Sequence, residues 1–464
     1  MATGFGKKWA GVVLAAGLCV ASAPMAVAES LSDALVAAYK HSGLLEQNQA
    51  LLRAADEDVA IAQAALRPTL TYMISHGWSD PNTSISGNST WATTAQLTAE
   101  FLIFNFGRGK AAVEAQKEIV LATRDGLTSV EQQILLRAVT AYLDVRSAIE
   151  NTQLQANSVR VLTQELRAAN DRFEVGEVTQ TDVALAQARL AAARASEASA
   201  RGDLDIAREE YRAATGNLPG NLSAPPRLPM TAKTLEAAKA IARQRHPDIL
   251  SAQHNVVAAD LASEISMAAM KPALVGNAQT KWQDAGGQDF VSNSVGVAVS
   301  GTIYSGGKLS AEYRKTVAKA EAARAGLHQA RLAVDQGVAN AWARLAVSAA
   351  SLEATDRQIR ASRVALRGAR EEASLGSRTT LDVLNAEQEL LDAEAARITA
   401  LSNQYLAAYS LLSSMGLLTA EHLKLGVVTY DPEAYFNTVK SAPVHRVSPQ
   451  GKRLDSLLEA LGKK

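Results

Sequence analysis

Cysteine is almost absent from this sequence. The 464-residue chain has one, Cys19. It lies in an N-terminal apolar segment and follows Leu18, whereas a lipoprotein signal would need a small residue there. We therefore expect neither a lipid anchor nor a disulfide framework in the exported chain, which must gain its stability from packing or assembly.

The N-terminal apolar run is too short to cross a bilayer. It covers residues 9–20, whereas a transmembrane helix needs about 20 apolar residues. Lys7 and Lys8 precede the run, and Ala26-Val-Ala28 then supplies the small residues that a signal peptidase reads. The pattern predicts a secretory signal peptide over residues 1–28, with cleavage before Glu29, rather than a membrane anchor.

An excess of basic charge is also missing. The full chain balances 47 basic residues against 47 acidic ones, and removing Lys7 and Lys8 with the signal leaves 45 against 47, a net charge of −2. A nucleic-acid partner is therefore not expected.

Catalytic and ligand-binding patterns are lacking as well. The segment GTIYSGGK (301–308) resembles a phosphate-binding loop, but its glycine spacing is off by one and Leu309 replaces the required hydroxyl residue. The seven histidines have no paired metal-ligand spacing, and no nucleophile–base pattern favours a hydrolase. We expect no enzyme activity, cofactor or metal.

Proline is absent from two long stretches, between Pro81 and Pro219 and between Pro272 and Pro432. Proline breaks helix interiors, and both stretches are rich in residues that favour helices. They predict long helices. In the first stretch apolar residues recur every seven positions, as in coiled coils, at Val113, Val120, Leu127 and Ile134.

The chain repeats itself at a spacing of about 200 residues. VGEVTQTDV (175–183) matches LGSRTTLDV (375–383), and Phe104–Arg108 matches Tyr304–Lys308. Arg67-Pro68 likewise matches Lys271-Pro272. Internal duplication defines the architecture: a first repeat over 29–230, a second over 231–417, and a C-terminal segment over 418–464.

Each repeat predicts the same succession of elements after an initial helix. The first has a β-hairpin at 69–104, a long helix at 107–173, a tip turn at 174–180, a return helix to 215 and a linker at the waist of the molecule. The second has a β-hairpin at 273–304, a long helix at 307–373, a tip turn at 374–380 and a return helix. The segment 418–464 is expected at the waist and partly disordered.

The two predicted hairpins alternate apolar and polar residues with period two, as strands of a transmembrane barrel do. Trp78, Trp91 and Trp282 lie near the hairpin turns, where a membrane-interface aromatic girdle is expected. Four strands cannot close a barrel, because the smallest have eight, so several chains must contribute. The alternative is two soluble hairpins that cap a helical bundle.

The repeated short segment predicts a tight reversal between two helices. Gly176 and Gly376 suit left-handed helix ends. Thr179 with Asp182, and Thr379 with Asp382, have the form of capping boxes that begin the next helices. Each copy is therefore expected at the far tip of a helical hairpin.

These features together resemble the TolC family of outer-membrane efflux proteins over nearly the whole mature chain. The resemblance includes the junctions FNFGRGK and IYSGGK and the turn LGSRTTLDVLNAEQEL. It implies a mainly α fold with a β-barrel part: a homotrimer whose twelve strands, four per chain, form one barrel continuous with a helical periplasmic tunnel. It also implies the outer membrane of a Gram-negative bacterium, contact with its lipid, a periplasmic adaptor, and an inner-membrane ABC or proton-driven transporter.

The resemblance also assigns roles at the tips. Asp382 and Asn385 would line the periplasmic gate, and Arg378, Thr181 and Asp182 would lock it. An acidic residue is the family's counterpart of Asn385, and an aromatic lock that of Ala373, so fewer charges and one fewer lock are expected. Asp382 has the alternative role of helix capping alone. The adaptor would dock on Val175, Gly176, Thr179, Leu375, Gly376 and Thr379.

The function implied is a passive exit duct for efflux or type I secretion. The alternative is a soluble periplasmic coiled-coil scaffold or adaptor, which would usually carry a lipoyl-like or barrel domain between its helices; no such segment is evident. The sequence leaves the cargo open among drugs, proteins, polysaccharide and metals.

Overall fold

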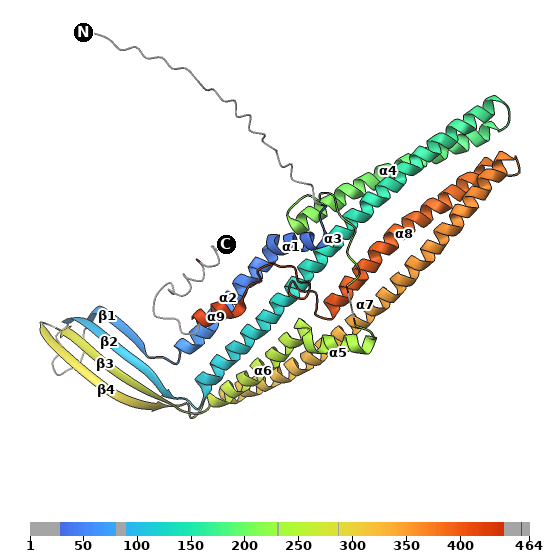
Figure 1. Ribbon diagram of the computed structural model, residues 1–464. Coiled ribbons are helices and arrows are strands. Elements are labelled where there is room, and N and C mark those ends of the chain that lie inside the picture. The colour runs from blue at the N-terminus through green and yellow to red at the C-terminus, as the bar shows by residue number, and fades with distance from the viewer. Residues whose placement is uncertain (1–27, 80–89, 230–231, 286, 440–455, 457–464) are drawn as a thin grey trace, which may run out of the picture.

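The computed structural model describes residues 28–79, 90–229, 232–285, 287–439 and 456. The molecule is elongated, with a small β-sheet at one end and the tips of two helical hairpins at the other (Figure 1). Most of the expected signal peptide, residues 1–27, and the turn of the first β-hairpin lie outside the described residues.

The elements alternate as a repeated helix–hairpin–helix pattern. In the first repeat they are α1 (Leu31–His41), α2 (Gly43–Ala64), β1 (Thr69–Ser79), β2 (Thr90–Phe104), α3 (Arg108–Glu174) and α4 (Gln180–Thr215). In the second they are α5 (Leu235–Arg245), α6 (Pro247–Ala268), β3 (Ala273–Ala285), β4 (Gln288–Ser300), α7 (Lys308–Ser374) and α8 (Thr380–Ser414), followed by α9 (Pro432–Val439).

The helices α3 and α7 set the length of the molecule. Each has 67 residues, about 100 Å at 1.5 Å per residue. Toward the sheet α3 packs against α2 and α6, and toward the tip it packs against α4; α7 lies against α6 and then α8 (Figure 1). In the part of the chain that the structure describes, no helix combines the length and apolar character needed to cross a membrane.

Short polar segments separate α1 from α2 and α5 from α6. Ser42 ends α1 and caps α2 by accepting a hydrogen bond from the Leu45 N–H. His246 and Pro247 similarly separate α5 from α6. The C-terminal segment, expected to be irregular, contains α9, which packs on α2.

The sheet has the strand order β1-β2-β3-β4, and all neighbours are antiparallel. Its middle pair joins the two repeats, because β2 runs beside β3 with Ala95 opposite Trp282 and Ala99 opposite Ala278. Among the described residues, strands β1 and β4 each have a neighbour on one side only. The sheet thus ends in two edges that remain available for pairing.

A core at the waist holds the start of α1 against α3 and α4. Tyr142 and Tyr211 are fully buried there. The Tyr211 hydroxyl donates to the Glu29 carboxylate over 2.6 Å, and the Tyr142 hydroxyl donates to the Ser223 carbonyl over 2.8 Å. The Glu29 N–H donates to the Asn221 carbonyl over 2.8 Å. The linker after α4 is therefore fastened to the beginning of the first repeat.

Candidate functional site

Both tips end their long helices with the same glycine motif. At the first tip Gly176 has φ +79°, its N–H donates to the Phe173 carbonyl over 3.0 Å, and the Glu177 N–H donates to the Arg172 carbonyl over 2.9 Å. The second tip has the same two bonds around Gly376, at 3.1 and 2.9 Å. This is the Schellman arrangement, which needs a left-handed residue at the position of the glycine.

The capping boxes expected at the tips are present. The Thr379 N–H and hydroxyl donate to the Asp382 carboxylate over 3.0 and 2.8 Å, and the Asp382 N–H donates to the Thr379 hydroxyl over 3.3 Å. Thr179 and Asp182 form the same box at 2.9, 2.7 and 3.3 Å. Hydrogen bonds from Thr379 hold the pKa of Asp382 below its usual range, and those from Thr179 do so for Asp182. Both carboxylates are therefore ionised at neutral pH.

Within one chain, Arg378 does not meet the other residues predicted to lock the gate. Arg378 lies in the turn between α7 and α8, and its guanidinium pairs with Glu372 near the end of α7. Thr181 and Asp182 lie on the other helical hairpin, where Thr181 is exposed and Asp182 closes its own capping box. A lock between Arg378 and these residues would therefore have to join different chains.

A polar contact that the sequence did not suggest joins the two helical hairpins near their tips. Arg189 on α4 donates from Nη2 to Oδ1 of Asn385 on α8 over 3.0 Å. Arg370 on α7 lies 2.8 Å from the Glu387 carboxylate and 3.4 Å from that of Glu165 on α3. We call these five residues the tip latch. Arg189 and Asn385 are 196 residues apart in sequence, and Glu165 and Arg370 are about 200 residues apart. Residue spacing along a single helix therefore could not predict these contacts.

An apolar contact supports the tip latch. Leu384 is 2% exposed and packs against Leu162, Leu190 and Ala193, which belong to the other hairpin. Leu384 lies next to Asn385, so the apolar and polar contacts occur on the same turn of α8. Parting the two hairpins would expose Leu384 and break the bond between Arg189 and Asn385 together.

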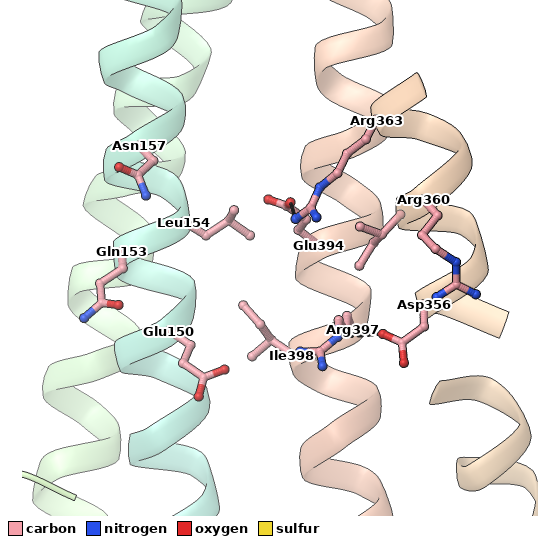
Figure 2. Close-up of a pocket in the computed structure, with 11 residues that line it drawn as sticks. Glu150, Gln153, Leu154, Asn157, Asp356, Arg360, Arg363, Glu394, Arg397 and Ile398 are labelled. Carbon is pink, nitrogen blue, oxygen red and sulfur yellow. Dashed lines mark hydrogen bonds and ion pairs between the residues drawn. The ribbon is translucent and has the colours of Figure 1, made fainter. Parts of the chain in front are cut away.

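Between the latch and the waist, a cleft of about 500 Å³ separates the hairpins. Figure 2 shows Glu150, Gln153, Leu154 and Asn157 of α3 on one side of it, and side chains of α7 and α8 on the other. The far side carries ion pairs that link α7 to α8, Arg363 with Glu394 at 2.8 Å and Arg397 with Asp356 at 2.7 Å. These pairs bridge the second hairpin internally, and the two hairpins contact each other on both sides of the cleft, at the waist through α3 and α8 and at the tip latch.

The turns themselves expose apolar side chains. Val175 is 71% exposed and Leu375 is 83% exposed, each directly before its glycine. The two predicted docking turns therefore have the same form, a solvent-facing aliphatic residue above a left-handed glycine.

At the opposite end, the sheet has one apolar face that we call the outer face. The strand register places its residues opposite one another across all four strands, and they are exposed in the single chain. Gly276 leaves room for the ring of Phe101, because a Cβ there would lie 2.3 Å from that ring. The large members are Leu70, Tyr72, Ile74, Trp78, Trp91, Leu97, Phe101, Trp282, Val291, Val295, Val297 and Val299.

The three predicted interface tryptophans lie on this outer face near the hairpin turns. Trp78 is the register partner of Trp91, and Trp282 is opposite Ala95 and Val291. The Trp91 ring stacks on His76 with a centroid distance of 4.9 Å. The three tryptophans thus lie at the end of the outer face that carries the hairpin turns, a position that suits an aromatic girdle at a membrane surface.

The other side of the sheet, the inner face, is polar. Gln96 lies opposite Lys281, Thr98 opposite Gln279, and Glu100 opposite Asn277. Burying Glu100, Lys281 and the amide side chains of this face in lipid would cost free energy, because lipid offers them no hydrogen bonds. The inner face therefore requires contact with water. The two faces together match the alternation of transmembrane barrel strands.

Comparison with known proteins agrees with this geometry. The model of the outer membrane efflux protein family matches residues 34–217 and 240–417. The outer membrane efflux protein BepC of Brucella suis is 34% identical over 449 residues, covering 96% of this chain and 97% of BepC. Escherichia coli outer membrane protein TolC is 27% identical over 423 residues, covering 85% of each chain.

Solved structures show the same fold. The channel protein CusC has a TM-score of 0.76 and 19% identity, covering 84% of this chain and 92% of CusC. The expected fold class, a helical tunnel with a β-barrel part, is therefore confirmed, as is the outer-membrane location. The chain belongs to the outer membrane efflux protein family.

Proposed function

We propose that three copies of this chain form a passive exit duct, with a β-barrel across the outer membrane and a helical tunnel below it. The observation that carries this proposal is the four-stranded sheet, with its exposed apolar face and two unpaired edges. A bilayer tolerates no open sheet edge, so β4 of one copy must pair with β1 of the next.

The polar inner face favours three copies over two. Two copies would supply eight strands, and an eight-stranded barrel has an interior that side chains fill. Lys281 and Glu100 on the inner face call for a water-filled lumen, which twelve strands can provide. Twelve strands also agree with the trimer implied by the family resemblance.

The tips would form the periplasmic mouth of the duct. Three Asp382 carboxylates around a threefold axis would repel one another and attract cations, while each also caps its helix. Asn385 adds no charge to this ring, and its bond to Arg189 favours a closed arrangement of the hairpins. Arg378, Thr181 and Asp182 would lock neighbouring chains to each other.

The exposed turns would be the docking surface for a periplasmic adaptor. Val175 and Leu375 offer apolar contacts, while Thr179 and Thr379 beside the glycines fix the shape of each turn. The adaptor would connect the duct to an inner-membrane ABC or proton-driven transporter, which would supply the energy. An ABC transporter in the gene neighbourhood would indicate secretion, and a proton-driven pump would indicate efflux.

The test is whether the purified protein forms channels. We expect it to fractionate with outer membranes, to resist salt extraction and to produce uniform conductance steps in planar bilayers. A protein released by salt that gives no conductance would instead be a soluble periplasmic scaffold or adaptor.

A further inference from the structure

The sheet meets the helices through four connections, and each carries a cation. Arg67 lies between α2 and β1, Arg108 begins α3, Lys271 lies between α6 and β3, and Lys308 begins α7. All four are exposed, as is Lys110 two residues after Arg108. We call these five cations the basic collar.

Acidic residues are absent from the stretches of chain that immediately surround the basic collar. The segments 59–75, 101–113, 265–280 and 290–311 contain the five cations and no aspartate or glutamate. Glu312 pairs with Lys308 at 4.0 Å, and Glu100 lies at this end of the sheet on the inner face, opposite Thr69. The amino-terminal ends of α3 and α7 lie here as well, and their dipoles add to the positive field. This end of the sheet is therefore positive, although the whole chain has no net charge.

Large apolar side chains lie beside these cations. Ile303 and Tyr304 are 103% and 86% exposed, and Phe104 and Phe106 are 53% and 45% exposed. The Phe104 and Phe106 rings are 4.8 Å apart. They continue the apolar outer face of the sheet toward the helices, at the depth where a barrel has its second aromatic girdle.

The backbone at Phe106 indicates that this ring has a role. Phe106 has φ +55°, a left-handed conformation that bulky residues rarely adopt. The corresponding residue of the second repeat is Gly306, with φ +63°. The fold thus needs a left-handed residue at both junctions, and the first junction uses phenylalanine where glycine would be unstrained. Its ring lies 5.2 Å from Lys271 Nζ, in a cation–π contact.

We propose that the basic collar and its aromatic residues bind anionic phospholipid headgroups in the periplasmic leaflet of the outer membrane. The proposal rests on the membrane-spanning role proposed above. The rings would lie at the boundary of the acyl chains, and the five cations would face the phosphates, as basic residues next to membrane segments do. Each copy in the ring would repeat the same collar, so the whole circumference would favour anionic lipid.

The test compares two lipids with the same acyl chains, dioleoyl phosphatidylglycerol and dioleoyl phosphatidylcholine. Each is titrated onto the detergent-solubilised protein, and bound lipids are counted by native mass spectrometry. Each cation near a lipid surface contributes roughly fivefold to the preference for an anionic lipid over a neutral one. We expect at least a tenfold preference for phosphatidylglycerol in the unaltered protein.

The variant with Arg67→Gln, Arg108→Gln, Lys271→Gln and Lys308→Gln should lose most of that preference. A matched control replaces four exposed arginines of the tunnel helices, far from the sheet, with glutamine: Arg160, Arg167, Arg194 and Arg367. The control should keep the preference. Equal binding of both lipids by the unaltered protein, or an equal loss in the control, would overturn the proposal.

Phe106→Gly provides a second variant that does not strain the fold. Glycine accepts φ +55°, so the melting temperature should stay the same or rise, while affinity for phosphatidylglycerol falls roughly two- to fivefold. Unchanged affinity would remove the ring from the site. Conductance in planar bilayers is recorded for the same preparations: channels without lipid preference would contradict only this inference, whereas no channels would contradict the proposed function.

Discussion

The bond between Arg189 and Asn385 gives a direct test of whether the two helical hairpins of one chain must part when the mouth opens. We expect Arg189→Ala to favour the open state. The bond is 3.0 Å long and lies in an exposed setting, so its loss should cost about 0.5–1 kcal/mol per chain. In a trimer that opens as a unit the three losses sum to roughly 1.5–3 kcal/mol, which shifts the open-to-closed ratio about 10- to 100-fold.

The assay is the open probability of single channels in planar bilayers, combined with a double-mutant cycle. Asn385→Ala should have nearly the same effect as Arg189→Ala, and the double variant should add little, because both remove one contact. Arg194→Ala, an exposed residue of the same helix, is the control. Fully additive effects of the two substitutions, or an Arg189→Ala channel that behaves like the control, would refute the reasoning.

Three further predictions concern charge. Asp382→Ala should raise single-channel conductance and weaken block by multivalent cations; unchanged conductance and block would remove Asp382 from the mouth. Arg378→Ser should loosen the closed mouth and increase cellular uptake of large antibiotics, whereas unchanged uptake would argue against a lock there. Burial raises the pKa of Asp56 to about 6 from 3.8, and within the part of the chain that the structure describes neither carboxylate oxygen has a hydrogen-bond partner, although Arg124 is near. The free energy of unfolding therefore decreases as pH rises above about 4, and the decrease reaches roughly 3 kcal/mol above pH 6. Asp56→Asn should raise the melting temperature at pH 7 but not at pH 4, and an equal effect at both would contradict the raised pKa.

The sequence was most informative where a structure depends on local geometry. Gly176 and Gly376 end their helices in the left-handed conformation expected of them, and Thr379 with Asp382 forms the expected capping box. The period-two pattern also predicted which side chains share a face of the sheet, because alternation alone fixes that. Turns, caps and strand faces each involve residues within a few positions of one another.

Contacts between distant segments were not predictable in the same way. Arg189 and Asn385 belong to different repeats, and nothing in the pattern of either helix marks them as partners. The tip latch depends on how two rigid hairpins lean toward each other, and hence on packing at Leu384 and at the waist. The positive end of the sheet was missed for the same reason, since its cations come from four separate connections.

We infer that sheets from three chains close one barrel. The measurement that tests it most directly is the native mass of the detergent-extracted protein, recorded on the preparation that forms channels. We expect three chains per complex. A conducting preparation of single chains, or a monomer whose sheet packs on a water-soluble body, would contradict it.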